Sequence, residues 1–182
     1  MSCQFKPKTS DSLASLVQGY KNEYRKDKNN ELSYFRNMDF DQALKKAAYA
    51  ENKNGRKFSH QYRLPKQASE QAFKKFTEIK TEIKATQNFE QLYELLDSNL
   101  RSIQDIGDLF IFDTALRIGA KLNYLPKELI VQSGSKEGAK KLGLTVKNKR
   151  VSLEQLPLLI RENLEPYEIE NFLCIYHKEF EK

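Results

Sequence analysis

The sequence of 182 residues contains no tryptophan and only two cysteines, five prolines and seven glycines. So few Gly and Pro residues disfavour an all-β fold, which needs many tight turns. Cys3 and Cys174 are too few and too far apart in sequence for a disulfide framework or a zinc site, which fits a reducing cytoplasm. No apolar run approaches the 18 residues of a membrane span, so we expect no membrane partner.

Signals for targeting and catalysis are also scarce. The first twelve residues lack the apolar core of a secretory signal, so we expect a cytoplasmic protein. His60 and His177 are lone histidines, and the sequence has no His-His or Cys-Cys pair at ligand spacing, so no metal and no cofactor is predicted. The nucleophile motif Gly-x-Ser-x-Gly does not occur. This inventory favours a protein without catalytic activity of its own.

Apolar residues recur at helical spacing along most of the chain. The pattern predicts an all-α, compact fold of about seven or eight helices, with residues 129–131 as a short strand or one helical turn. Expected helices cover residues 11–36, with the polar run 25–30 as a candidate break, and 65–86, and the apolar stretch 109–124 is expected to be buried. Others begin after the N-cap residues Asp39, Asn88, Ser135 and Ser152, and the last begins at Pro166. A basic helical N-terminal region, 1–86, and a helical core region, 87–182, are one interpretation; one continuous domain is the other.

The net charge of +6 is distributed unevenly. Residues 1–64 carry 13 Lys and Arg against 7 Asp and Glu, whereas residues 65–132 carry 9 against 10 and residues 133–182 carry 9 against 8. A second basic group nevertheless lies in the last third, at Lys140, Lys141, Lys147, Lys149 and Arg150. Such asymmetry favours an anionic partner, either nucleic acid or an acidic protein. A solvated, lysine-rich surface is the structural alternative.

Cationic and aromatic residues alternate in residues 55–64, GRKFSHQYRL. Guanidinium and ammonium groups neutralise phosphates, and aromatic rings stack on exposed bases. The candidate nucleic-acid-binding residues in this segment are Arg56, Lys57, His60, Gln61 and Arg63, of which Gln61 and Arg63 have the groups that read base edges. The structural alternative is a loop between helices whose aromatic rings pack into the core.

The apolar stretch contains Asp113 and Arg117, a spacing that places both on one face of a helix. A structural ion pair on this helix that anchors neighbouring helices is one interpretation of this spacing. Residues 112–118, FDTALRI, with Lys121 and Leu122 following, resemble the Val-Asp-Thr-His-x-x-Arg segment of the helix-hairpin-helix DNA glycosylase superfamily. The carboxylate in that family assists cleavage of the base–sugar bond. The resemblance therefore implies a helical DNA-handling domain, with Asp113 as the catalytic candidate.

Three hypotheses follow for the function. The first is a cytoplasmic nucleic-acid-binding protein, without catalytic activity, that contacts the phosphate backbone through its basic N-terminal region. The second is a glycosylase-like enzyme that uses Asp113. The third is a protein-interaction or regulatory module of a phage or mobile element, whose basic face meets an acidic partner. Salt-dependent binding of nucleic acid separates the first hypothesis from the third, and an abasic product separates the second from the first.

Overall fold

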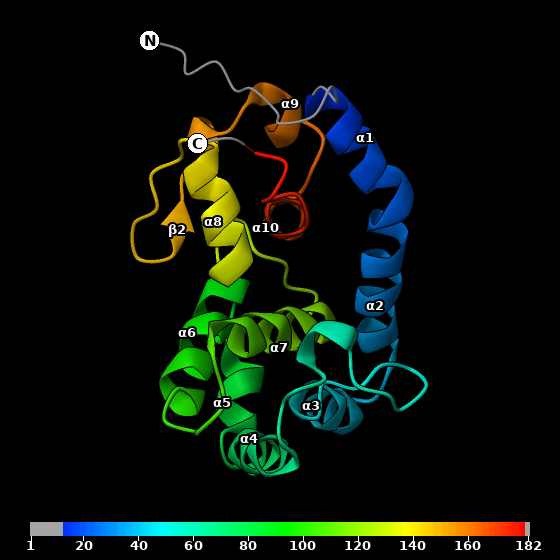
Figure 1. Cartoon of the computed structure of the whole chain (residues 1–182). Helices are drawn as coiled ribbons and strands as arrows, with labels where there is room; N and C mark the ends of the chain where they lie inside the picture. The colour runs from blue at the N-terminus through cyan, green and yellow to red at the C-terminus, as the bar shows by residue number, and fades with distance from the viewer. Residues whose placement is uncertain (1–12, 181–182) are drawn as a thin grey trace. The chain divides into compact units, whose positions relative to one another are not determined.

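A computed structural model describes residues 13–180, which form ten α-helices, two short 3₁₀ helices and one two-stranded sheet (Figure 1). The prediction of an all-α fold is confirmed. Strand β1 (Leu129–Ile130) pairs antiparallel with β2 (Arg150–Val151), so the segment expected to be a strand or a turn is a strand. Among the described residues, no helix has the length and apolar character needed to cross a membrane.

The chain divides into two compact units. Unit 2 is Asn29–Pro126, and unit 1 combines the described residues up to Lys28 with those from Lys127 onward. The division therefore differs from the expected boundary after residue 86, which falls inside unit 2. Ile83 and Phe89, on either side of that position, are both buried, and the Tyr124 hydroxyl donates to the Thr86 carbonyl oxygen at 2.8 Å. These contacts join the two sides of the expected boundary into one core.

Unit 2 is built around α7 (Asp108–Lys121), in which every residue from 110 to 120 is buried. The helix packs against α3 (Phe40–Ala48) and α6 (Phe89–Leu100), and α3 packs on α4 (Lys66–Glu78). Gly119 is required where the chain returns after α7, because a Cβ at this position would lie 2.8 Å from the Tyr124 carbonyl oxygen. The predicted N-caps are confirmed: the side chains of Asp39 and Asn88 accept backbone N–H groups of the following turn.

Two expected helices are divided in the structure. The segment 65–86 forms α4 and α5 (Lys80–Ala85), because Ile79 leaves the helical conformation between them while its side chain stays buried. The segment 11–36 forms α1 (Leu13–Glu23) and α2 (Arg25–Asn37). Helical hydrogen bonds continue across Tyr24, whose N–H donates to Tyr20 and whose carbonyl accepts from Lys28. Both segments are helical as predicted. The division at Tyr24 lies next to the polar run 25–30, the candidate break, whereas the apolar spacing does not indicate the division at Ile79.

Unit 1 is centred on the packing of α8 (Ser133–Lys141) against α10 (Pro166–Ile175). The 3₁₀ helix η2 (Leu153–Gln155) and α9 (Leu158–Arg161) complete it, with Ser152 as the predicted N-cap of η2. The α8 backbone approaches α10 so closely that a Cβ on Gly138 would lie 2.4 Å from the Leu173 carbonyl oxygen. Ser135, expected as an N-cap, lies inside α8, and its hydroxyl donates to the buried Glu170 carboxylate at 2.7 Å.

Candidate functional site

The loop that connects α3 to α4 in unit 2 is tightly structured. It turns at Gly55, whose φ of +71° is a conformation that glycine adopts without steric cost. The Asn52 backbone N–H donates to the Arg56 carbonyl at 2.9 Å, and Glu51 and Lys57 form an isolated antiparallel bridge. The ammonium group of Lys57 donates to the Leu64 carbonyl oxygen. Lys57, a predicted phosphate ligand, is therefore committed to closing the loop.

The 3₁₀ helix η1 (Ser59–Gln61) in this loop directs two side chains toward α7. Gln61 is buried, its Nε2 donates to Asp113 Oδ2 at 3.0 Å, and its Oε1 accepts from Arg117 Nη1 at 2.8 Å. The His60 Nε2 lies 2.8 Å from the same Asp113 oxygen. The structure thus places Gln61 inside the protein instead of on the surface predicted for a base-reading residue. The cause is the pair of buried charges on α7, because the Gln61 amide forms a hydrogen bond with each of them.

Arg117 links this arrangement to α2. Its Nε donates to Glu31 Oε1 at 2.8 Å, while its Nη2 lies 4.0 Å from Asp113 Oδ2. Its guanidinium also lies over the Phe58 ring, 4.1 Å from the centroid. We call Glu31, His60, Gln61, Asp113 and Arg117 the buried polar network. Removing three charged groups from water is costly unless each has close partners. The network supplies them from α2, the loop and α7.

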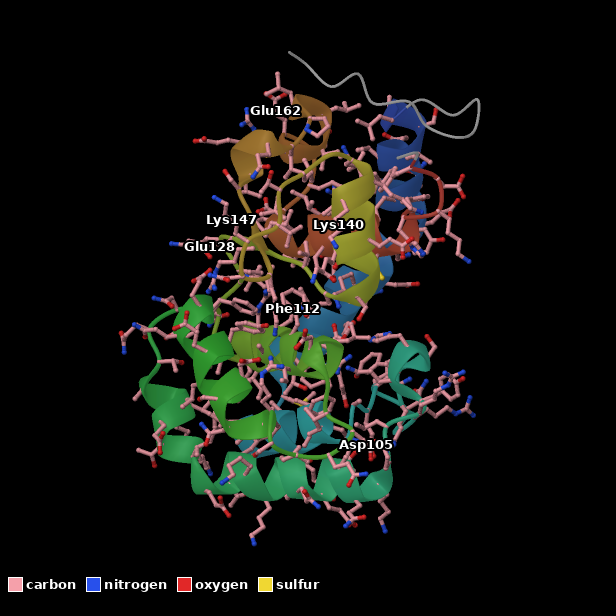
Figure 2. The ribbon with its side chains drawn as sticks, turned by 60° about the vertical axis from the view of Figure 1, so that its left-hand side comes forward. Asp105, Phe112, Glu128, Lys140, Lys147 and Glu162 are labelled. Carbon is pink, nitrogen blue, oxygen red and sulfur yellow. The ribbon has the colours of Figure 1, made fainter. Side chains whose placement is uncertain are left out.

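A cavity of about 320 Å³ lies beside the exposed end of the network. This volume is at the lower end of the range for small-ligand sites, so one ring-sized group fits. The cavity is lined by His60, Gln61, Arg63, Leu64, Pro65, Asp105, Gly107, Leu109 and Phe110. One part of its wall is therefore apolar, and the remainder offers an imidazole, a guanidinium and a carboxylate. Figure 2 shows Asp105 on the turn that precedes α7. His60 is the network residue with an accessible side chain, 42% exposed.

Tyr62, between the cavity-lining residues Gln61 and Arg63 in sequence, presents its ring to solvent. It is 63% exposed, more than any other large hydrophobic residue described. The Arg63 guanidinium lies over its ring at 5.3 Å from the centroid, and Arg63 Nε donates to the Tyr62 hydroxyl at 2.7 Å. Arg56 is exposed on the same loop. Of the loop residues predicted to bind nucleic acid, the structure therefore leaves Arg56, His60 and Arg63 accessible.

The second basic group lies in unit 1. Asn148 and Lys149 have φ values of +48° and +63°, so they form the tight turn of a hairpin that Lys147 and Arg150 close. The Arg150 guanidinium donates to Glu128 at 2.5 Å, and Lys141 donates to the His177 carbonyl oxygen at 2.8 Å. Figure 2 shows Lys140 on α8 and Lys147 on the hairpin, and both are exposed.

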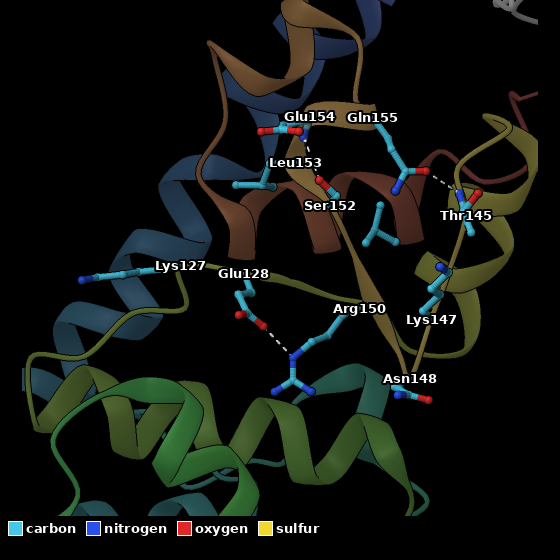
Figure 3. A pocket seen from close by; sticks show the side chains of 11 residues that line it. Lys127, Glu128, Thr145, Lys147, Asn148, Arg150, Ser152, Leu153, Glu154 and Gln155 are labelled. Carbon is cyan, nitrogen blue, oxygen red and sulfur yellow. Dashed lines mark hydrogen bonds and ion pairs between the residues drawn. The ribbon is translucent and has the colours of Figure 1, made fainter.

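The hairpin borders an open hollow of about 850 Å³ in unit 1 (Figure 3). Lys147 and Arg150 contribute positive charge, but Glu128 and Glu154 also line the hollow. Figure 3 shows the Glu128 carboxylate facing Arg150. The charges of this hollow are therefore mixed and partly paired within unit 1. The predicted cations of the last third do not form a uniform basic surface.

Sequence reasoning missed the roles of Glu31, Phe58 and Arg117 in the site. Glu31 and Arg117 are 86 positions apart, so no local spacing connects them. The expected direct pair of Asp113 with Arg117 is loose, because the guanidinium turns to Glu31 and Gln61 instead. Within residues 13–180, no group of three or more His, Cys, Asp or Glu side chains is arranged to hold a metal ion. No protein-family model, curated protein or solved structure matches this chain.

Proposed function

We propose that the protein binds single-stranded nucleic acid through the loop of unit 2. In this proposal Tyr62 stacks on an unpaired base, while Arg56 and Arg63 neutralise neighbouring phosphates. The observation that carries it is the 63% exposed Tyr62 ring, covered on one side by the guanidinium of Arg63, which itself lines the cavity. Single strands are favoured over duplexes because an aromatic platform needs a base that is free of its own stack.

The anchoring of the loop supports this proposal. The loop is fixed to α7 through Gln61 and His60 and closed by the Lys57 contact to Leu64, so Tyr62 is presented without a large loss of chain entropy on binding. One stacked base contributes about 1–3 kcal/mol. Each phosphate contact on a single strand adds about −0.7 to the slope of log affinity against log salt. We therefore expect weak, salt-dependent binding with a shallow slope.

The test is a fluorescence-anisotropy titration of labelled single-stranded RNA and DNA and of duplex DNA at low and moderate salt. Tyr62→Ala is expected to weaken single-strand binding about tenfold, as expected for the loss of one stacked base. Arg56→Gln together with Arg63→Gln is expected to weaken binding at low salt and to flatten the salt dependence. Absence of binding to every strand at low salt overturns the proposal.

The matched control is Lys45→Gln together with Lys74→Gln. These exposed lysines lie on α3 and α4 instead of on the loop, and their replacement also removes two positive charges. Binding through the loop predicts that the control retains the wild-type slope. An equal loss in the control and loop variants indicates a general attraction to positive charge. Both loop variants are expected to melt close to the wild type, because exposed loop charges contribute little to stability.

A further inference from the structure

We propose that His60 is a general base, and that the protein cleaves bound single-stranded RNA by activating the RNA's own 2′-hydroxyl. This inference rests on the proposed function, because it requires RNA on the same loop. It goes beyond binding by assigning a reaction to the cavity. It differs from a glycosylase-like reaction in using His60 as the reacting group, with the phosphodiester as the bond that breaks.

The first step of the argument concerns the imidazole. Asp113 is 6% exposed, and a carboxylate can only accept hydrogen bonds. The proton of neutral His60 therefore resides on Nε2, 2.8 Å from the Asp113 oxygen, and Nδ1 carries the free lone pair. A buried carboxylate that orients a histidine in this way also stabilises the imidazolium that forms when the ring accepts a proton. The geometry thus prepares His60 to accept a proton from a group in the cavity.

The second step concerns the cost of the arrangement. Arg117 is fully buried, and Asp113 and Glu31 retain little access to solvent. A loop can be anchored with far less buried charge, because a neutral hydrogen bond or an apolar contact suffices. The accessible side chain of this network is His60, and it lines the cavity. Fixing the orientation of that imidazole is the role that accounts for the arrangement.

The third step identifies the nucleophile. The residues that line the cavity include no Ser, Thr, Cys or Lys. The nucleophile that His60 activates must therefore come from the bound molecule or from water. Because the proposed ligand is a nucleic acid, the 2′-hydroxyl of RNA is the nucleophile already positioned beside a phosphate. Arg63, which lines the same cavity, supplies positive charge for the phosphate as negative charge develops on it.

The step balances without a co-reactant. His60 Nδ1 takes the proton of the 2′-hydroxyl while the 2′-oxygen forms a bond to phosphorus. The bond from phosphorus to the 5′-oxygen breaks, and that oxygen keeps the electron pair and takes a proton from water. The hydroxide so formed accepts the proton that His60 gained, which restores the neutral imidazole. The products are a 2′,3′-cyclic phosphate and a 5′-hydroxyl end.

The experiment uses the full chain with a 5′-labelled single-stranded RNA and an all-deoxy strand of the same sequence, both in EDTA. Binding of both strands is measured alongside cleavage. We expect the RNA to be cut to fragments ending in 2′,3′-cyclic phosphate and the deoxy strand to be bound but left intact. His60→Gln is expected to lower the cleavage rate ~100-fold or more at saturating RNA, where a weaker anchor between the loop and α7 does not affect the rate. A second variant, His60→Asn, guards against a folding defect in the first.

Asp113→Asn tests the positioning role. We expect it to lower the rate at saturating RNA and to change the dependence of the rate on pH, because the Nε2 proton loses its anionic partner. Wild-type protein that binds the RNA but leaves it intact overturns the inference and leaves the proposed function standing. Cleavage by folded His60→Gln or His60→Asn at the wild-type rate overturns it as well. A chain that binds neither strand removes both proposals together.

Discussion

Buried charged side chains have different roles in the two units. In unit 1 the Arg25 guanidinium donates twice to Glu168, at 2.7 and 2.8 Å, and Ser135 donates to Glu170. Each contact joins one helix to α10, and Arg25 also donates to the Asn163 carbonyl oxygen at 2.6 Å. In unit 2 the network passes from α2 to Arg117 on α7, then through Gln61 and Asp113 to the accessible His60. Buried polar contacts in unit 1 hold helices together, whereas those in unit 2 also orient a side chain at a cavity.

The largest expected difference between the units follows removal of one arginine from each. Arg117→Met leaves Glu31 without its buried partner and Gln61 with an unmet acceptor, so we expect the free energy of unfolding to fall by about 3–5 kcal/mol. Arg25→Met removes the arginine that pairs with Glu168. Because the Arg25 side chain is 28% exposed, water replaces part of the lost contact, and we expect the free energy of unfolding to fall by about 1–3 kcal/mol.

Chemical denaturation measures both changes, and hydrogen exchange assigns each loss to a unit. Glu31→Gln added to Arg117→Met is expected to recover part of the loss, because it removes the stranded charge. Asp113→Ala is expected to cost less than Arg117→Met, since Arg117 keeps its hydrogen bonds to Glu31 and Gln61. Equal losses for Arg117→Met and Arg25→Met contradict the comparison.

The second prediction compares close backbone packing in the two units. Gly138→Ala in unit 1 and Gly119→Ala in unit 2 each place a methyl group against a carbonyl oxygen, at 2.4 and 2.8 Å respectively. A backbone cannot move aside as a side chain can, so we expect losses of about 1–3 kcal/mol, larger for Gly138→Ala. Gly107→Ala is the control, because a Cβ there meets nothing within 4 Å. A Gly138→Ala protein as stable as the control shows that α8 and α10 are less tightly packed.

The helices of both units were predictable because their apolar spacing and caps are local. Asp39 and Asn88 mark the starts of α3 and α6, and the largely apolar character of residues 109–124 indicated that α7 is buried. The loop at 55–64 was also singled out, by its alternation of cations and rings. The partners of this loop inside the protein could not be predicted, because His60 and Asp113 are 53 positions apart and meet only through tertiary packing. Strands of two residues are too short to show an alternating pattern.

The third prediction concerns alkaline pH and unit 1. Burial is the main cause that raises the pKa of Tyr20 well above its ordinary value, against a hydrogen bond from Asn171 that lowers it. The folded state therefore holds the Tyr20 proton more tightly than the unfolded state. This contribution to stability is fully present below the unfolded pKa of 10.0 and is lost as pH rises through the raised folded value.

Tyr20→Phe tests this effect. At neutral pH it removes the hydroxyl that accepts from Asn171, for a loss of about 0.5–1.5 kcal/mol. Above pH 10 the variant is expected to lose stability less steeply than the wild type, as measured by denaturation over a pH series. Burial also raises the pKa of Tyr176, so some alkaline loss remains. Identical alkaline slopes for the two proteins contradict the assignment to Tyr20.

The smallest expected effect is the loss of stability when surface carboxylates are protonated in acid. We expect this loss to be similar in the two units. Hydrogen bonds from the Gln42 and Asp41 backbone N–H groups lower the pKa of Asp39 in unit 2, and the Lys141 ammonium lowers the pKa of Glu137 in unit 1. A lowered folded pKa means that the contribution is present above the unfolded value, 3.8 for Asp39 and 4.5 for Glu137. It is lost as pH falls through the folded value.

Asp39→Asn keeps an N-cap at every pH, so its melting temperature should match the wild type within a few degrees at neutral pH and decline less in acid. Glu137→Gln is the unit 1 counterpart and loses the ion pair to Lys141 at neutral pH, again with a small change. Hydrogen exchange of the first turn of α3 and of the last turn of α8 reports each effect separately. A large acid response confined to unit 2 contradicts this prediction and points instead to Glu31 and Asp113 of the buried polar network, because the buried carboxylates of unit 1, Glu168 and Glu170, then tolerate the same pH.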